Sequence, residues 1–126
     1  MVEMIIVVVI IFILGTIGLG QYMAATERAR AGKARSAMIL ISKAEKMFAQ
    51  ENGGAFIVCT NADLVANLGV FIEMNDIQNS DPDWDYAVAV GGGGFTVTAT
   101  KAAGRMNAGE TIILNQNGDW TGTFSP

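Results

Sequence analysis

The chain opens with MVEMIIVVVIIFILGTIGLGQYMAA, residues 1–25, and this segment decides how the rest can fold. Sixteen positions run from Met4 to Leu19, and only Gly15, Thr16 and Gly18 among them are not strongly apolar. As a helix this run would rise about 24 Å at 1.5 Å per residue. Extended to the end of the segment, it reaches the roughly 17–25 residues that cross a bilayer. Because it is apolar on every side, it must lie in lipid or inside other protein.

Glu3 is the only charged residue of this segment, and two interpretations of it are open. It is either an interfacial charge, held by the helix N-terminal dipole and by headgroup water, or a carboxylate drawn into an apolar environment. In the second case it needs a cationic partner, because an unpaired buried charge is costly.

Glu3, the apolar run behind it and the exit Leu19-Gly20-Gln21-Tyr22 resemble the N-terminus of proteins with a class III signal, the type IV pilins and type II secretion pseudopilins. The family opening after leader cleavage is Phe-Thr-Leu-Ile-Glu, and Met1-Val2-Glu3 matches its last three residues. Two family residues, including the N-methylated first one, therefore have no counterpart here. Gly20 stands where the family commonly has proline. The match covers about the first quarter of the chain.

The resemblance implies a role for Glu3, a surface location and a set of partners. In the family the matching carboxylate neutralises the N-terminal amine of a neighbouring subunit inside a filament. The partners would be further copies of the chain in a helical homopolymer, the inner membrane before assembly, the prepilin peptidase, the pilus assembly platform and minor pilins. The product would be an extracellular filament (fimbrium) of the kind used in adhesion, motility or secretion. Before assembly, the family orientation places the head in the periplasm, whereas Arg28 to Arg35 alone would favour a cytoplasmic head.

Three glycines, Gly15, Gly18 and Gly20, fall within six positions of the apolar helix. Each would cost about 1 kcal/mol relative to alanine in a water-exposed helix. They indicate either close helix–helix contact in lipid or, as the resemblance implies, a segment that melts when subunits pack into a filament.

Length and charge indicate an anchor, residues 1–23, and one modest head, residues 24–126. The chain has 126 residues and a net charge of −4. Residues 1–51 contain six basic and four acidic residues, and residues 52–126 contain two basic and eight acidic residues. A basic shaft and an acidic head either attract further copies of the chain or are a solvated surface of mixed charge.

The helix is predicted to continue through residues 24–51, where alanine, methionine and charged helix formers dominate. An apolar stripe recurs at spacings of three and four residues and would pack on the head: Ala34, Ala37, Ile41, Ala44 and Phe48. Most charged residues avoid this stripe, and Glu45 is predicted to do so with Lys43 and Lys46. Asn52-Gly53-Gly54 should end the helix with a left-handed cap.

Residues 52–83 are predicted to connect the helix to a sheet. Thr60 or Asn61 would cap a short helix that runs through Leu68 and ends at Gly69. A polar loop follows, from Asn75 through Ser80 to Asp83. Its region contains four aspartates, Asp76, Asp81, Asp83 and Asp85, which would bind calcium as in related pseudopilins or form a solvated turn. Their spacing matches no EF-hand, so we predict the turn and no metal site.

Residues 84–126 change to a period of two, which predicts strands. Trp84, Tyr86, Val88 and Val90 alternate, Gly91 to Gly94 form a hairpin loop, and a second strand follows from Phe95. A third strand spans 111–116, Asn117-Gly118 is a tight turn, and a fourth spans 120–124. The prediction is an α+β fold in which a four-stranded antiparallel meander buries Trp84 and Trp120 against the helical stripe, as in the pilin fold.

The composition argues against an enzyme and against nucleic-acid binding. Histidine is absent, and Cys59 is the only cysteine, so it has neither a disulfide partner within the chain nor a base to activate it. We expect a half-buried thiol there, or a disulfide between chains. No basic face interleaved with aromatics is present, and no cofactor is predicted.

Three functions are therefore weighed. The first is a structural subunit of a type IV pilus, most like a major pilin. The second, in the same family, is a type II secretion pseudopilin. The third, from another class, is a membrane-anchored extracytoplasmic binding module whose helix is only a tether.

Overall fold

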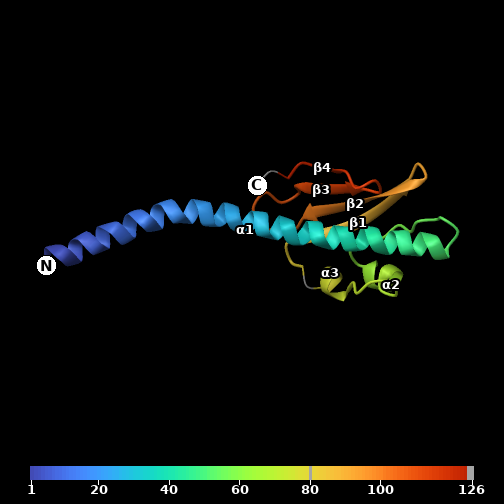
Figure 1. Ribbon diagram of the computed structural model, residues 1–126, viewed down its shortest axis with the longest axis horizontal. Helices are drawn as coiled ribbons and strands as arrows, with labels where there is room; N and C mark the ends of the chain where they lie inside the picture. The colour runs from blue at the N-terminus through green and yellow to red at the C-terminus, as the bar shows by residue number, and fades with distance from the viewer. Residues whose placement is uncertain (80, 125–126) are drawn as a thin grey trace. The chain divides into compact units, whose positions relative to one another are not determined.

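The computed structural model describes residues 1–79 and 81–124. Figure 1 shows its helices α1 (Val2–Glu51), α2 (Leu64–Leu68) and α3 (Asn75–Asn79) and its strands β1 (Trp84–Gly91), β2 (Gly94–Lys101), β3 (Thr111–Asn115) and β4 (Trp120–Gly122). The long N-terminal helix and the antiparallel sheet confirm the predicted α+β fold. The chain divides into two compact units, with the division between Gly32 and Lys33.

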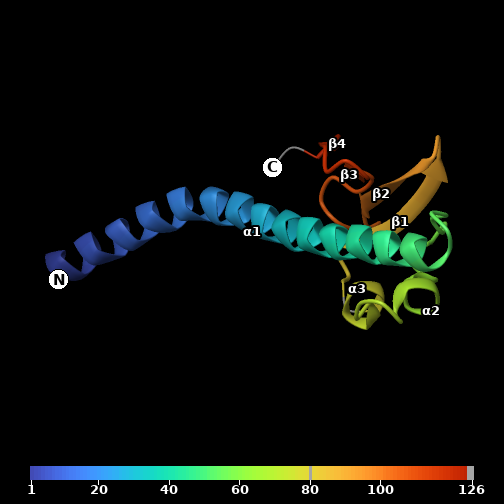
Figure 2. The ribbon, with the colours of Figure 1, turned by 45° about the vertical axis from the view of Figure 1, so that its right-hand side comes forward.

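The second half of α1, within the second unit, is the central element of the head. Figures 1 and 2 place the sheet on one side of it and α2 and α3 on the other. Its stripe is buried as a row of mainly small side chains, namely Ala34, Ala37, Met38, Ile41 and Ala44. Phe48 is half-buried and meets the Phe71 ring edge-on, with the ring centroids 6.2 Å apart. Small side chains allow the sheet to approach the helix closely, and the two largest fully buried side chains, Trp84 and Tyr86, come from β1.

The end of α1 is closed by backbone hydrogen bonds, as its Asn-Gly-Gly sequence predicts. The Gly54 N–H donates to the Ala49 carbonyl over 2.7 Å, and Gly53 adopts φ +69°. This is the six-to-one bond of a Schellman cap, which needs a residue in the left-handed region. The chain then turns back along the head.

The four strands form a meander in the order β1-β2-β3-β4, with every neighbouring pair antiparallel. Burial alternates along β1 and β2, and Trp84, Tyr86 and Val88 are buried on β1. Gly92 and Gly93 join these strands, both with positive φ, which is the backbone of a type I′ hairpin. Val90, expected to continue the alternation, is exposed near this turn.

Lys101 continues the buried alternation of β2 although it is charged. It is only 4% exposed, and its Nζ lies 5.8 Å from the centre of the Trp84 ring and 5.4 Å from that of Phe124. An ammonium group near two aromatic faces is attracted by their quadrupoles. No pattern in the sequence predicted that Lys101 is buried.

The prediction that Trp120 lies in the core is wrong. Strand β4 contains three residues, all exposed, and Trp120 is 39% exposed. It pairs with Leu114 at the edge of the sheet, and Arg35 lies 5.8 Å from its ring centre. Because β4 is an edge strand, one side of this tryptophan has no covering element among the described residues. Phe124, after the strand, packs against Trp84 instead, with ring centroids 5.5 Å apart.

The connecting region also differs from its prediction. Helix α2 begins only at Leu64, with Asp63 at its N-cap and no capping bond from the Asp63 side chain. Asn61 instead accepts the Tyr86 N–H of β1 at 3.1 Å. The expected polar loop contains α3, because Met74 and Ile77 are buried one helical turn apart. Ser80 of that loop and the last two residues of the chain lie outside the described residues.

The two tryptophans give a matched test of this core. Trp84→Ala should lower the free energy of unfolding by about 3–5 kcal/mol, since it leaves a cavity beneath the sheet. Trp120→Ala should lower it by about 1 kcal/mol or less, since it removes an edge contact. Thermal unfolding of the full-length chain in detergent micelles, followed by circular dichroism, measures both. Equal losses would contradict the assignment of Trp84 to the core and Trp120 to the edge.

Candidate functional site

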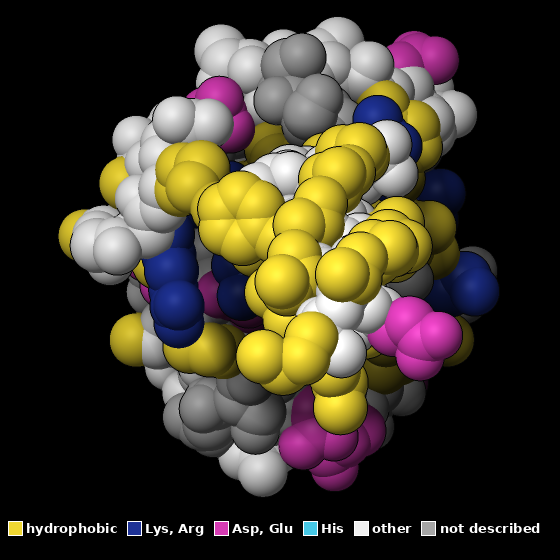
Figure 3. All heavy atoms as spheres, turned by 90° about the vertical axis from the view of Figure 1, so that its left-hand side faces the viewer, with side chains coloured by type: hydrophobic (Ala, Val, Ile, Leu, Met, Phe, Trp, Pro, Cys, Tyr) yellow, Lys and Arg dark blue, Asp and Glu magenta, His cyan; other side chains and the backbone are white. Residues whose placement is uncertain are grey.

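The apolar half of α1 is a long exposed apolar surface. Every large apolar side chain from Met4 to Met23 is at least 45% exposed. An eighteen-residue stretch of the helix has a mean hydropathy of 2.8, and none of it is buried. Figure 3, viewed from the N-terminal end, shows hydrophobic side chains covering most of this part of the helix. By length and composition the helix can cross a membrane, and water is an unfavourable environment for it.

Glu3 lies in the first turn of α1 and is exposed. The first-turn position places its carboxylate beside the positive end of the helix dipole. No ion pair to Glu3 is formed among the residues that the structure describes. The structure thus places a carboxylate at the N-terminal end of an apolar surface and provides no cation for it within the described chain.

The three glycines of this segment are helical and lie in open space. A Cβ added at Gly15, Gly18 or Gly20 would have no neighbour within 4 Å beyond the adjoining helix. Packing inside the described chain therefore does not require glycine at these positions. Close contact with another helix and melting on assembly both stay as predictions.

Two of the four aspartates weighed as calcium ligands make other contacts. Asp81 accepts the Tyr86 hydroxyl at 2.6 Å, and Asp83 forms an ion pair with Arg105 at 3.2 Å. Burial and the Asp81 carboxylate both raise the pKa of Tyr86, so its hydroxyl stays protonated and donates. Within residues 1–79 and 81–124 no group of three or more His, Cys, Asp or Glu side chains could hold a metal ion.

A buried polar cluster joins α1 to the connecting region, and the prediction that Glu45 avoids the apolar stripe is wrong. Glu45 is 0% exposed. Its carboxylate accepts the Ile57 N–H at 3.0 Å and faces the Cys59 thiol at 3.8 Å. Cys59, expected to be half-buried, is fully buried, and it also accepts from the Asn67 amide at 3.7 Å. The helical spacing signals this, because Glu45 follows buried Ile41 by four residues.

Burial sets the protonation of both members of this cluster. It raises the pKa of the Glu45 carboxyl, and the hydrogen bonds from Ile57 and Cys59 offset part of that rise. Burial also raises the pKa of Cys59 to about 11, to which the nearby Glu45 and Asp63 carboxylates contribute. A buried thiol with a raised pKa is a poor nucleophile, so the cluster is a structural clasp between α1 and residues 57–59.

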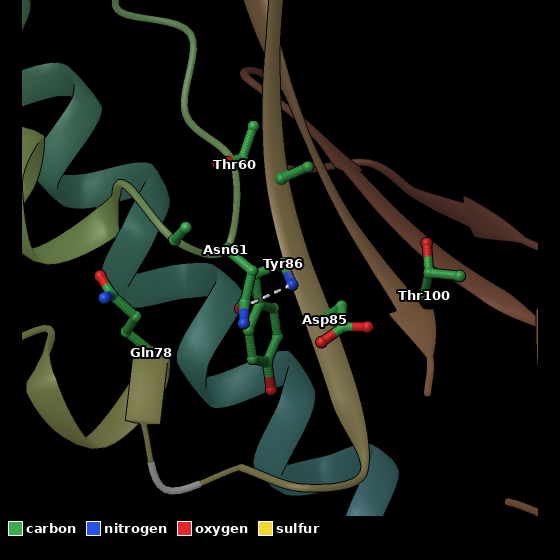
Figure 4. Close-up of a pocket in the computed structure, with 8 residues that line it drawn as sticks. Thr60, Asn61, Gln78, Asp85, Tyr86 and Thr100 are labelled. Carbon is green, nitrogen blue, oxygen red and sulfur yellow. Dashed lines mark hydrogen bonds between the residues drawn. The ribbon is translucent and has the colours of Figure 1, made fainter. Parts of the chain in front are cut away.

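An open cleft of about 660 Å³ lies at the outer edge of β1 (Figure 4). Asn61 and Gln78 lie on one side of the strand, and Asp85 lies in register with Thr100 on the other. Both amide oxygens are already used by the fold, since Asn61 accepts from Tyr86 and Gln78 accepts the Val65 N–H at 2.7 Å. The polar groups that the cleft offers to a ligand are therefore the Asp85 carboxylate, the Thr100 hydroxyl and the N–H groups of the two amides.

No protein-family model, curated protein or solved structure matches this chain.

Glu45 makes unfolding dependent on pH in a defined direction. Because the pKa is raised in the folded chain, the Glu45 contribution to stability is fully present below the ordinary glutamate pKa. It is lost as pH rises through the raised value. Glu45→Gln keeps an acceptor for Ile57 but cannot ionise, so its stability relative to the native chain should increase as pH rises from 4 to 8. Chemical unfolding of the full-length chain in detergent at several pH values measures this.

The matched variant is Glu45→Ala. It leaves the partly buried Ile57 N–H without its acceptor and should cost about 1–3 kcal/mol at pH 4. This cost should shrink as pH rises, because alanine, like glutamine, cannot ionise. If Glu45→Gln shows the same pH dependence as the native chain, Glu45 does not titrate as its burial indicates.

Proposed function

We propose that this chain is the structural subunit of a type IV pilus, most like a major pilin, and that it polymerises through the apolar half of α1. The observation that carries the proposal is a helix that exposes apolar side chains on all sides and has a carboxylate in its first turn. A tether needs only the apolar length. A charge in the first turn adds a requirement for a cationic partner once other helices cover this surface.

The apolar half of α1 needs cover in every state of the protein. In the inner membrane, acyl chains would provide it. In a filament, the same surface would be covered by the helices of other copies, which replaces lipid by protein without exposing apolar area to water. The prepilin peptidase and the assembly platform would move the chain between these states, with minor pilins as further filament components.

Glu3 would give this apolar packing its register. Apolar contacts have no direction, so they do not fix how far one helix slides along another. A buried carboxylate does fix it, because only one offset places a neighbour's N-terminal amine beside Glu3. Removing one member of a buried ion pair typically costs about 3–5 kcal/mol, because the other charge is left unpaired.

A membrane-anchored binding module is the second candidate, and the cleft beside β1 is the observation that favours it. Its Asp85 carboxylate and Thr100 hydroxyl could bind a small polar ligand. A binding module would use α1 only as a tether, so it would not depend on Glu3.

Glu3→Ala separates the two candidates. We expect cells that express the native chain to yield thin uniform filaments on shearing, and cells with Glu3→Ala to yield essentially none. Glu51→Ala is the matched control, because it removes an exposed carboxylate at the other end of the same helix. Electron microscopy and immunodetection of the sheared fraction provide the measurement.

Filaments of equal yield from the Glu3→Ala strain would exclude the proposed role of Glu3. A native chain that stays in the membrane and forms no filaments would exclude the pilus subunit altogether and leave the binding module.

A further inference from the structure

Charge is segregated along the head in a way that the fold alone does not require. Residues 28–46 contain six basic residues and one acidic residue, and that one, Glu45, is buried in the core. Residues 47–100 contain seven acidic residues and no lysine or arginine. The surfaces built by these two parts of the chain therefore have opposite signs.

The first of these surfaces is the outward side of the second half of α1. Spacings of three and four residues place five exposed side chains on one side of this helix. We call them the basic face: Ile39, Leu40, Lys43, Lys46 and Met47. No ion pair to Lys43 or Lys46 is found in the described part of the chain. The basic face thus combines exposed apolar area with two available cations.

The second surface lies on the α2–α3 segment, on the opposite side of α1 from the sheet (Figures 1 and 2). We call its exposed apolar and acidic side chains the acidic surface: Asp63, Val65, Val70, Glu73 and Asp76. Val70 is 87% exposed, which is unusual for a valine in a folded head. Among residues 1–79 and 81–124 no cation pairs with these carboxylates.

We propose that the basic face of one copy docks on the acidic surface of a second copy of this chain. Each surface has apolar side chains beside charges, and the charges of the two are opposite, which is the complementarity that sets specificity and register at an interface. The two surfaces differ, so the contact is head-to-tail. Such a contact repeats along an open helix unless its rotation closes a ring.

The inference deepens the proposed function and rests on it, because a filament joined only by apolar helices has no contact that aligns its heads. It also explains why neither surface pairs its charges within the part of the chain that the structure describes. Charges that are needed between copies are left available by the fold of each copy.

Charge reversal with rescue tests the contact. The variant Lys43→Glu with Lys46→Glu places like charges on the two sides of the proposed contact. The variant Glu73→Lys with Asp76→Lys does the same. Each should lower the yield of sheared filaments at least roughly tenfold. All four changes combined restore opposite signs and should recover most of the yield. Glu51→Lys with Asp119→Lys is the matched control, since it reverses two exposed carboxylates outside the acidic surface and should leave the yield unchanged.

A second measurement tests the contact on the native chain, whether or not filaments form. A carbodiimide joins amines to carboxylates that touch, and peptide mass spectrometry identifies the joined residues. Sheared filaments, and membranes solubilised after the reaction, should give a dimer band that contains a link between Lys43 or Lys46 and Glu73 or Asp76. The monomer band should lack that link.

The outcomes separate the two proposals. Filaments without this link, or reversal without loss and rescue, would overturn the contact and leave the pilus subunit standing. The link in membranes of cells that form no filaments would support the contact while the pilus subunit fails. The contact would be overturned by a dimer band without the link or by no dimer band at all. It would also be overturned if the lysines were modified only by lipid, because that result would favour a basic face that lies on the membrane.

Discussion

The structure depends on one constraint, which is that the first half of α1 has no side suited to water. A helix of this hydropathy can be covered by a protein core, a bilayer or other helices. Within the first unit, its large side chains from Met4 to Met23 are exposed among the described residues. Any proposed function must therefore account for what covers them.

The second half of the same helix, in contrast, is covered by its own chain. Its alanine stripe allows the sheet and the α2–α3 segment to pack closely on two of its sides. With one cysteine there is no intrachain disulfide to hold the connecting region. The Glu45 clasp takes part of that role, since it binds the Ile57 backbone to α1 in a buried setting where the hydrogen bond is strengthened by the low dielectric.

Periodicity predicted most helices and strands well, but it did not predict the burial of several single residues or the short helix α3. The period-two strands, the Gly92-Gly93 turn and the helix end at Gly53 follow from local chemistry, and the structure confirms them. The predicted burial is wrong for Trp120 and Glu45, and the burial of Lys101 was not predicted. In each case residue type was given more weight than position. Trp120 is apolar but lies on an edge strand, whereas Glu45 and Lys101 are charged but lie in the buried register of α1 and β2. Helix α3 was not predicted, because its sequence is mainly polar. Only two buried residues, Met74 just before the helix and Ile77 within it, attach it to the core.

Two carboxylates on α1 show how the helix differs at its two ends. Glu45 is enclosed, and its chain provides the donors that it needs. Glu3 sits beside a larger apolar surface, and the described chain provides it with no ion pair. If the apolar surface is covered by lipid alone, Glu3 can stay hydrated among the headgroups. If other helices cover it, the carboxylate is desolvated and requires a cation from one of them. The environment of Glu3 therefore distinguishes an anchor from a subunit, and the rest of the chain is compatible with both.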